Sequence, residues 1–262
     1  MKELKDMQNE RDTREISIDR VGVRDVRFPI IVSDKERRTQ STVARVALMV
    51  DLPKEYKGTH MSRFVEALHE HKRYLDVHTA VRLPDRLLRK LDAQRARVEI
   101  EFPFFRLKKA PVSGMEGVMD YDVRFEIDAE RGKPGSFTLT LKVPVTTLCP
   151  CSKAMSEKSA HNQRGIVTYS VRFSGAAVWI EDLIDLIEGC ASCQLYSLLK
   201  RPDEKYVTDK AYEQPVFVED LVRNVAVATE RYNAFSWYRV EAENFESIHN
   251  HNAYAMVEKD LS

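Results

Sequence analysis

The stretch "VPVTTLCPCSK" at residues 143–153, followed by "AHNQRG" at residues 160–165, carries the most specific chemistry of the chain. Its first half is apolar and rich in β-branched residues, which is typical of a buried strand. Pro150 lies between two cysteines, and proline lacks the amide proton that a helix or strand needs. We therefore expect the chain to leave a strand and turn here, with both thiols on irregular backbone.

Candidate metal ligands in this stretch are Cys149, Cys151 and His161. Thiolate sulfur and imidazole nitrogen are ligands of zinc, iron and manganese sites. A catalytic metal keeps one position open for water, so three protein ligands are expected. A lone cysteine is more often a small core residue. A second thiol two positions away and a following histidine favour the metal site instead.

The composition of the chain excludes several classes of protein. Among 262 residues, 41 basic and 41 acidic side chains balance, so nothing indicates a general affinity for nucleic acid or acidic membranes. No apolar run approaches a membrane span, and the charged N-terminus lacks the apolar region of a signal peptide. Four cysteines in so long a chain do not indicate a secreted disulfide scaffold. We expect a cytoplasmic, reduced protein.

Four stretches together resemble one enzyme family. They are "VPVTTLCPCSKAMSEKSAHNQRG" from Val143, "KGTHMSRF" from Lys57, "QPVFVEDLVR" from Gln214 and "NFESIHNHNAYA" from Asn244. They resemble segments of type IB GTP cyclohydrolase I, the prokaryotic enzyme that opens the pterin and folate pathway. The stretches cover both halves of the chain. The different histidine-cysteine motif of the type IA enzyme is not found here.

The resemblance implies an α+β tunnelling fold (T-fold) of two ββααββ modules in one chain. Its antiparallel sheets carry helices on one side, and subunits assemble through them into a barrel. We expect a mobile polar tail at residues 1–14, a first module at 15–131 and a second module at 135–262 that carries the metal site. The two halves share little residue-level similarity, so the repeat is one of pattern only.

Apolar periodicity places the elements of this pattern. Strands are predicted at residues 16–32, 42–52, 98–107 and 121–127, and again at 137–145, 167–173, 235–242 and 254–257. Helices are predicted at residues 61–71, 83–91, 179–199 and 215–231. Each half therefore reads as two strands, two helices and two strands.

The resemblance assigns the metal to Cys149, His161 and a glutamate beyond the first helix of the second module. We assign this third ligand to Glu204, in "RPDEKYVTDKAYE", with Asp203 and Glu213 as rivals. Buried acids are rare, so a solvated surface carboxylate is the alternative for each of them. One divalent ion per site is expected, and this donor set suits zinc, manganese or iron. No organic cofactor is expected.

Further residues receive a role from the resemblance. Glu219 is expected to anchor the purine edge of GTP, although a carboxylate in the first turn of a helix also complements the helix dipole. His249 and His251 are expected to transfer protons. Without the resemblance, such a pair indicates surface residues or an adventitious metal site. The basic residues that could hold the triphosphate are Arg63, Lys153, Lys158 and Arg164.

The reaction implied is hydrolysis of GTP to 7,8-dihydroneopterin triphosphate and formate. The metal lowers the pKa of bound water, and the resulting hydroxide attacks the imidazole ring of guanine. Cys151 is expected to enter or leave the coordination sphere with the identity of the metal. The family implies a homo-oligomer, a dimer of dimers, with active sites at subunit interfaces.

Two alternatives stay open at this stage. A structural zinc site could use all four cysteines, which are Cys149, Cys151, Cys190 and Cys193. Against it, the last two lie one helical turn apart in an apolar segment, where cysteine serves as a core residue. The queuosine-pathway nitrile reductase, a relative in fold, uses a cysteine nucleophile. The "AHNQ" motif and the pair of C-terminal histidines argue against that enzyme.

Overall fold

The computed structural model describes residues 8, 10–71, 74–75, 77–175 and 178–261. Contacts between Cα atoms divide the chain into two compact units. The first unit consists of the described parts of Met1–Ser33, Arg37–Phe102 and Arg124–Thr138. The second consists of the described parts of Asp34–Glu36, Pro103–Val123 and Leu139–Ser262. Most of the tail expected at residues 1–14 lies outside the described residues.

The first unit combines strands with three helices. Its strands are β1 (Ile18–Asp34), β2 (Arg38–Leu52), β3 (Tyr74–Leu75) and parts of β4 (Arg95–Lys109) and β5 (Glu116–Glu130). Its helices are α1 (Met61–Glu70), α2 (Val77–Ala80) and α3 (Arg82–Leu91). Apolar residues at helical spacing predicted helices α1 and α3. Four of these residues, Phe64, Leu68, Leu83 and Leu87, are completely buried.

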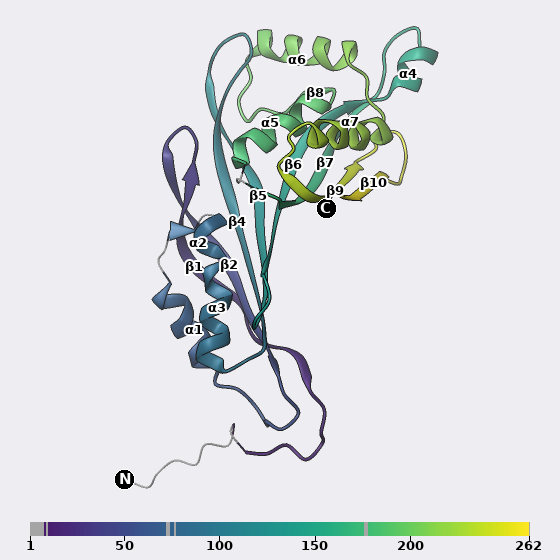
Figure 1. Cartoon of the computed structure of the whole chain (residues 1–262). Coiled ribbons are helices and arrows are strands. Elements are labelled where there is room, and N and C mark those ends of the chain that lie inside the picture. The colour runs from purple at the N-terminus through teal and green to yellow at the C-terminus, as the bar shows by residue number, and fades with distance from the viewer. Residues whose placement is uncertain (1–7, 9, 72–73, 76, 176–177, 262) are drawn as a thin grey trace. The chain divides into compact units, whose positions relative to one another are not determined.

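The second unit holds the remaining strands and helices. Its strands are the other parts of β4 and β5, most of β6 (Ser136–Leu148), then β7 (Asn162–Phe173), β8 (Cys193–Gln194), β9 (Phe235–Asn244) and β10 (Ala253–Asp260). Its helices are α4 (Pro150–Met155), α5 (Ile180–Cys190), α6 (Arg201–Glu213) and α7 (Val218–Glu230). Helix α7 packs on β9, β10 and α5 (Figure 1). No helix among the described residues has the length and apolar character needed to cross a membrane.

Alternation along β6 explains where the core of the second unit lies. Leu141, Val143 and Val145 are fully buried, whereas the intervening Lys142 is exposed. Successive strand residues point to opposite faces of a sheet, so one face of β6 is apolar and the other is polar. Tyr169 on β7 continues the buried face. The site residues at the ends of these strands therefore sit on a packed support.

The expected architecture of two ββααββ modules is wrong. The described strands hydrogen-bond in the order β10-β9-β7-β6-β5-β4-β2-β1-β3, with β8 added beside β6, as one ten-stranded sheet. Along the second half the order of elements is β6-α4-β7-α5-β8-α6-α7-β9-β10. Two helices and one short strand are thus inserted that the module pattern does not contain. The first half also adds β3, which pairs in parallel with β1.

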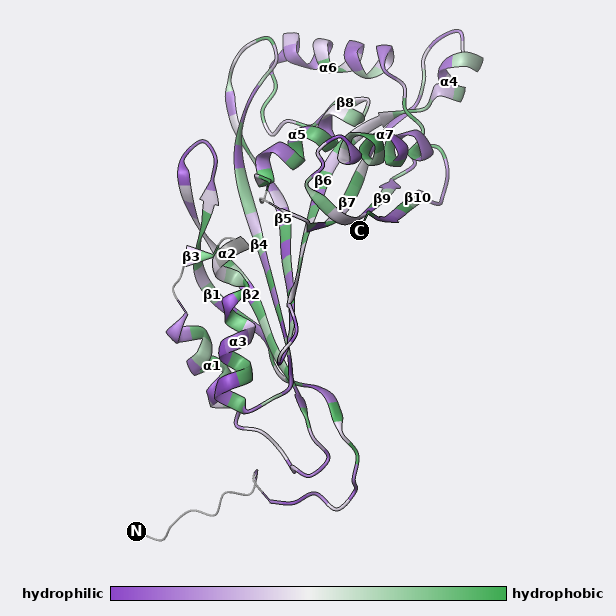
Figure 2. Ribbon diagram, in the orientation of Figure 1, coloured by the Kyte–Doolittle hydropathy of each residue, from purple (hydrophilic) through white to green (hydrophobic). Residues whose placement is uncertain are grey.

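Local chemistry explains the inserted elements. Pro150 starts helix α4, because proline is tolerated in the first turn, where its missing amide proton would have no partner. The helix predicted at 179–199 ends at Cys190, and residues 193–194 pair with β6 instead. Helix α6 was not predicted because its sequence lacks a broad apolar face, and Figure 2 colours most of it as hydrophilic.

Asp203 joins the N-terminus of α6 to the turn between β4 and β5. Its carboxylate accepts hydrogen bonds from the N–H groups of Val112, Ser113 and Lys200 at 2.8 Å each, and from the Ser113 hydroxyl at 2.7 Å. Burial would raise the pKa of this carboxyl, but the four donors outweigh it and hold the pKa well below its usual range. Asp203 therefore acts as a clip between two segments.

Replacing Asp203 with Asn should lower the melting temperature by a few degrees near neutral pH, because one of its two acceptor oxygens becomes an amide donor. Since folding lowers the pKa of Asp203, its contribution is present above about pH 4 and is lost as pH falls further. The variant should therefore lose less stability on acidification than the parent. Thermal unfolding by circular dichroism across this range measures both effects.

Asp209→Asn is the matched control, because Asp209 is an exposed acid of the same helix that pairs with Lys205 at the surface. Such pairs contribute little to stability. If Asp203→Asn were no more destabilising than Asp209→Asn, the clip would have no role in folding.

Candidate functional site

The pairing of β6 with β7 places Cys149 beside His161. The register runs from Leu139↔Val171 to Leu148↔Asn162. One step further, the Cys149 N–H donates to the His161 carbonyl at 3.1 Å. Cross-strand neighbours have Cβ atoms within about 5.5 Å, so both candidate ligands lie at the same end of the sheet. The two residues that sequence analysis chose first are thus brought together.

Helix α4 shapes the backbone around Cys149. Cys149 is its N-cap, and the Ser152 N–H donates to the Cys149 sulfur at 3.4 Å. The Ser152 hydroxyl oxygen accepts from the His161 N–H at 3.2 Å, which links the helix start to β7. Cys151 lies exposed in the first turn of the same helix, not on irregular backbone as expected.

The imidazole of His161 is held on one side by polar partners. Its Nδ1 lies 2.9 Å from Oε1 of Gln163 and 3.7 Å from Oε2 of Glu246. The side chain of His161 is 14% exposed and that of Glu246 is 12% exposed. Histidine therefore presents its other nitrogen, Nε2, away from these contacts.

Glu246 is a site residue that sequence analysis missed. The β7–β9 register, Gly165↔Asn244, continues with a 2.9 Å hydrogen bond from the Phe245 N–H to the Arg164 carbonyl. The next residue, Glu246, therefore lies beside His161. Its Oε2 is buried, and within the described part of the chain it has no hydrogen-bond partner. The stretch "NFESIHNH" contains Glu246 and could have drawn attention to it. Only the strand register shows that Glu246 lies beside His161.

Gly165 permits this close approach of β9 to β7. A Cβ atom at this position would lie 2.4 Å from Oδ1 of Asn244 and 3.2 Å from the Glu243 carbonyl oxygen. Both distances are shorter than van der Waals contact, and one involves backbone that cannot move aside. Glycine at this position therefore keeps the row of site residues together.

Glu204 is not brought to Cys149 and His161 within the described chain. It is exposed on α6, and no three His, Cys, Asp or Glu side chains among the described residues converge closely enough to hold a metal ion. Of its rivals, Asp203 is occupied by the four donors of the clip, and Glu213 is exposed at the end of α6. The third metal ligand stays a prediction.

His249 and His251 lie in the connection between β9 and β10. Both are exposed, and their rings stack with centroids 5.1 Å apart and planes 13° apart. They are accessible to a substrate and have no partner that fixes their protons in the described residues. Their exposed position is therefore compatible with the expected proton transfer.

Glu219 lies in the first turn of α7, next to the end of β6. The Val216 N–H donates to the Leu148 carbonyl at 3.0 Å, so the segment that enters α7 runs beside the residue that precedes Cys149. Glu219 is exposed. Its carboxylate is available to a ligand, and it also complements the dipole of α7.

The four basic residues differ in their surroundings. The Lys153 ammonium donates to the Tyr212 carbonyl at 2.5 Å and lies 4.3 Å from the centre of the Tyr212 ring, which ties α4 to the end of α6. Lys158 and Arg164 are exposed, and among the described residues their side chains make no hydrogen bond or ion pair. Arg164 lines a cavity of about 410 Å³ in the second unit. Arg63 is exposed on α1, in the first unit.

The four-cysteine zinc site is not formed within the described residues. Cys190 ends α5 and Cys193 begins β8, so they do not share a helix as expected. Burial raises the pKa of the Cys190 thiol to about 11 and also raises that of Cys193. Both thiols are therefore protonated near neutral pH, with Cys193 buried in the core and Cys190 half-buried.

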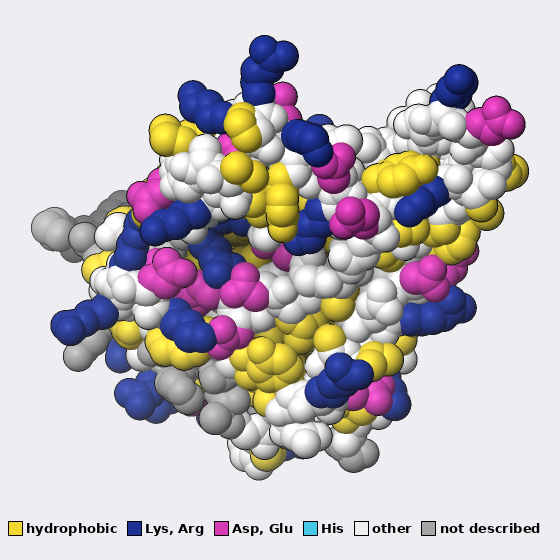
Figure 3. Space-filling view, turned by 90° about the horizontal axis from the view of Figure 1, so that it is seen from above, with side chains coloured by type: hydrophobic (Ala, Val, Ile, Leu, Met, Phe, Trp, Pro, Cys, Tyr) yellow, Lys and Arg dark blue, Asp and Glu magenta, His cyan; other side chains and the backbone are white. Residues whose placement is uncertain are grey.

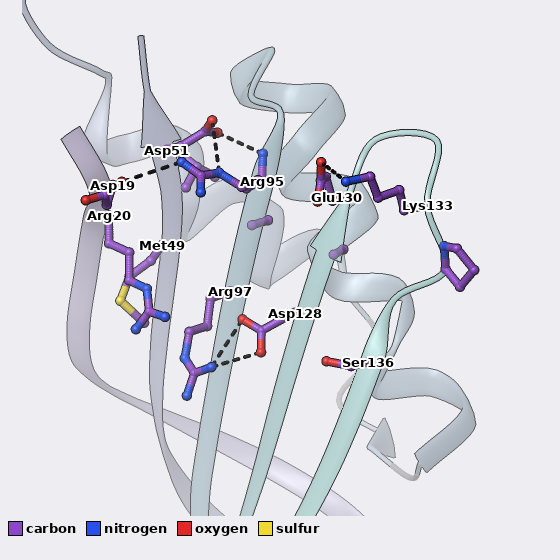
Figure 4. Close-up of a pocket in the computed structure, with 14 residues that line it drawn as sticks. Asp19, Arg20, Met49, Asp51, Arg95, Arg97, Asp128, Glu130, Lys133 and Ser136 are labelled. Atoms are coloured by element: carbon purple, nitrogen blue, oxygen red, sulfur yellow. Dashed lines mark hydrogen bonds and ion pairs between the residues drawn. The ribbon is translucent and has the colours of Figure 1, made fainter. Parts of the chain in front are cut away.

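A cavity of about 610 Å³ in the first unit contains none of the predicted site residues. Its charged groups neutralise one another: Arg97 pairs with Asp128, Arg95 with Asp51, and Lys133 with Glu130 (Figure 4). Charges are also mixed on the face that Figure 3 shows from above, where positive and negative side chains are interspersed. Neither surface indicates a site for a highly charged ligand.

Solved structures similar to this chain include urate oxidases. A mutant urate oxidase of Bacillus sp. TB-90 superposes with a TM-score of 0.55 at 9% identity, covering 93% of this chain and 100% of that chain. Urate oxidase from Bacillus subtilis 168 gives 0.55 at 9% identity, covering 92% and 98%. At such identity the likeness shows the fold alone. The architecture is therefore described by its likeness to urate oxidases, in place of the two expected modules.

Proteins related to this chain by sequence show much higher identity than these solved structures. The chain is 71% identical to GTP cyclohydrolase FolE2 of Akkermansia muciniphila over 262 residues, which covers 100% of this chain and 99% of that one. It is 51% identical to the FolE2 proteins of Magnetococcus marinus and Geobacter sulfurreducens, covering 97% and 98% of this chain and 96% and 98% of theirs. The family model described as type I GTP cyclohydrolase folE2 matches residues 4–255. This chain belongs to the type I GTP cyclohydrolase folE2 family.

Proposed function

We propose that this chain catalyses the type IB GTP cyclohydrolase I reaction, converting GTP to 7,8-dihydroneopterin triphosphate and formate. The observation that carries the proposal is the cross-strand pair of Cys149 and His161 at the end of β6 and β7. It supplies a thiol and an imidazole in a chain that matches the family over residues 4–255. The product class, a reduced pterin triphosphate, feeds tetrahydrofolate biosynthesis.

The donor set at this pair fits a divalent cation. Cys149 and His161 would hold it through sulfur and Nε2, with Cys151 nearby, and the orphaned carboxylate of Glu246 adds negative charge next to the imidazole. Zinc, manganese or iron all suit such donors. When bound, the cation supplies Lewis-acid activation of water. A reduced cytoplasm suits this site, because oxidation would consume its thiols.

The third ligand is proposed to come from a neighbouring subunit. Glu204 is exposed on α6 and does not meet the pair within the described chain. A homo-oligomer, which we expect to be a dimer of dimers, would allow Glu204 of one subunit to complete the site of another. The same arrangement would bring Arg63 to the triphosphate beside Lys158 and Arg164.

Two groups act on the substrate itself. Guanine presents a ring N–H and an exocyclic amino group side by side, and the two oxygens of the Glu219 carboxylate can accept from both. His249 and His251 would give protons to the ring nitrogens released on ring opening and take them during reclosure, which imidazole does well near neutral pH.

The direct test is an assay of the purified protein with GTP and added manganese or zinc. Oxidation of the product should give pterin fluorescence, and formate should appear in equal amount. NADPH should not be consumed. Hydride consumption without pterin formation would contradict the proposal and favour a nitrile reductase.

The metal centre can be tested by chelation and by Cys149→Ala. Chelation should abolish activity until metal is restored, whereas Cys149→Ala should lose activity permanently, because two remaining ligands bind the ion too weakly. Cys190→Ala is the control and should keep nearly full activity, since this half-buried thiol ends α5 and joins no group of metal ligands among the described residues. Equal loss in both folded variants would favour a four-cysteine site.

Proton transfer can be tested with His249→Ala and His251→Ala. Each substitution should lower kcat by about two to four orders of magnitude, the usual effect of removing a general acid or base. Metal content, measured by elemental analysis, should change little. A variant that arrives without metal would instead identify that histidine as a ligand.

Substrate selection can be tested at Glu219. Glu219→Ala should bind metal normally but lose GTP turnover, and Glu219→Gln should be only partly better because its amide sets a donor against a guanine donor. Inosine triphosphate, which lacks the exocyclic amino group, should be a poorer substrate of the parent. The measurement is kcat/KM for both nucleotides. Unchanged selectivity in Glu219→Ala would leave this residue with a helix-dipole role only.

A further inference from the structure

We propose that Gln163, hydrogen-bonded to Thr147, is a positioning residue that fixes which nitrogen of His161 carries the proton. The inference rests on the proposed function, in which His161 holds a divalent cation. Gln163 and Thr147 have no role in the proposed reaction itself. Neither Gln163 nor Thr147 touches the substrate in this account, so both act through the imidazole.

Three side chains form a continuous chain of contacts across β6 and β7. Thr147 and Gln163 are direct cross-strand partners in the register. The Gln163 amide nitrogen donates to the Thr147 hydroxyl oxygen at 2.9 Å, and Oε1 of the same amide lies 2.9 Å from Nδ1 of His161. Thr147 is fully buried and Gln163 is 8% exposed. Water therefore does not compete for these groups.

The chemistry of the amide fixes the direction of both hydrogen bonds. An amide NH₂ group can only donate and an amide oxygen can only accept. Because the NH₂ group faces Thr147, the oxygen faces His161, and Nδ1 must carry the proton to make this contact. The neutral imidazole then has its lone pair on Nε2.

Glu246 acts in the same direction. Its Oε2 lies 3.7 Å from Nδ1, too far for a hydrogen bond, but close enough for a carboxylate to favour a proton on that nitrogen. Among the described residues, Gln163 and Glu246 are the side chains found next to Nδ1, and neither favours a proton on Nε2. The site is therefore arranged to keep Nε2 free.

A free Nε2 is what a cation requires. Only a nitrogen with a lone pair can ligate a metal, and the partner of the opposite nitrogen sets which one is free. If the Gln163 amide turned by half a rotation, its NH₂ group would face Nδ1 and the proton would move to Nε2. The Thr147 hydroxyl accepts from the NH₂ group in the observed orientation, and the Glu246 carboxylate opposes the rotated state, because it favours a proton on Nδ1.

The test uses the full-length protein, prepared with and without metal, and four variants. Gln163→Leu removes the acceptor, Thr147→Val removes the anchor at nearly constant shape, and Gln163→Glu keeps a group that can only accept. Thr140→Val is the matched control, because Thr140 also makes a cross-strand hydroxyl contact from β6 to β7, to Ser170 at 2.8 Å, without reaching His161.

Two readouts separate positioning from a structural role. The ¹⁵N resonances of the His161 ring in metal-free protein report which nitrogen carries the proton, with His161→Gln for assignment. Zinc affinity is measured by competition with a chromophoric chelator. Loss of a residue that orients a ligating histidine costs about 10- to 100-fold in metal affinity.

We expect Gln163→Leu to weaken zinc binding by about 10- to 100-fold and to shift the proton toward Nε2. Thr147→Val should act in the same direction to a smaller extent. Gln163→Glu and Thr140→Val should keep the parent's tautomer and affinity. Parent-like tautomer and affinity in Gln163→Leu would overturn the proposal, and if that variant does not fold, the same result in Thr147→Val would do so.

A lowered melting temperature with unchanged tautomer and affinity would likewise overturn the proposal, because it would show a structural role only. The outcome is independent of GTP turnover. If the parent binds zinc and follows the expected order of variants but releases no formate from GTP, the proposed function fails while the positioning of His161 stands.

Discussion

The antiparallel pairing of β6 with β7 is the constraint on which the site depends. Its register fixes Thr147 opposite Gln163 and extends to the hydrogen bond between Cys149 and His161. A shift by one residue would move every side chain of a strand to the other face of the sheet. The alternating apolar residues that bury one face of β6 therefore also hold the register of the site. Packing and chemistry are specified by the same pattern.

A second pairing adds the acid at the site. Strand β9 lies against β7, and Gly165 allows the approach that brings Glu246 to His161. A buried carboxylate oxygen without a partner is costly, so such a group is retained where it serves a ligand or a charge. The site combines rigid strand ends that carry Cys149 and His161 with an exposed connection that carries His249 and His251. Rigid parts suit metal ligands, whereas exposed parts suit groups that must meet a substrate.

Much of the secondary structure followed from periodicity, since apolar spacing located α1, α3, α7 and the long strands. The errors have local causes. Helix α4 was missed because Pro150 was taken as the end of regular structure, although it starts a helix. Helix α6 was missed because most of its residues face solvent, and its position depends on the Asp203 clip to a turn about ninety residues earlier. The module pattern could not reveal that all strands join one hydrogen-bonded order.

The sequence by itself determined the donor types and their motif: two thiols around Pro150, a histidine twelve residues after the first, and segments that match one family along the chain. Those features are local, so the linear order of residues displays them. Only the tertiary structure decided which groups touch. Gln163 contacts His161, Glu246 approaches it from just beyond the end of β9, and the Asp203 carboxylate is hydrogen-bonded within the fold. The reason is physical: strand register and burial depend on contacts between distant segments, which no single stretch of sequence contains.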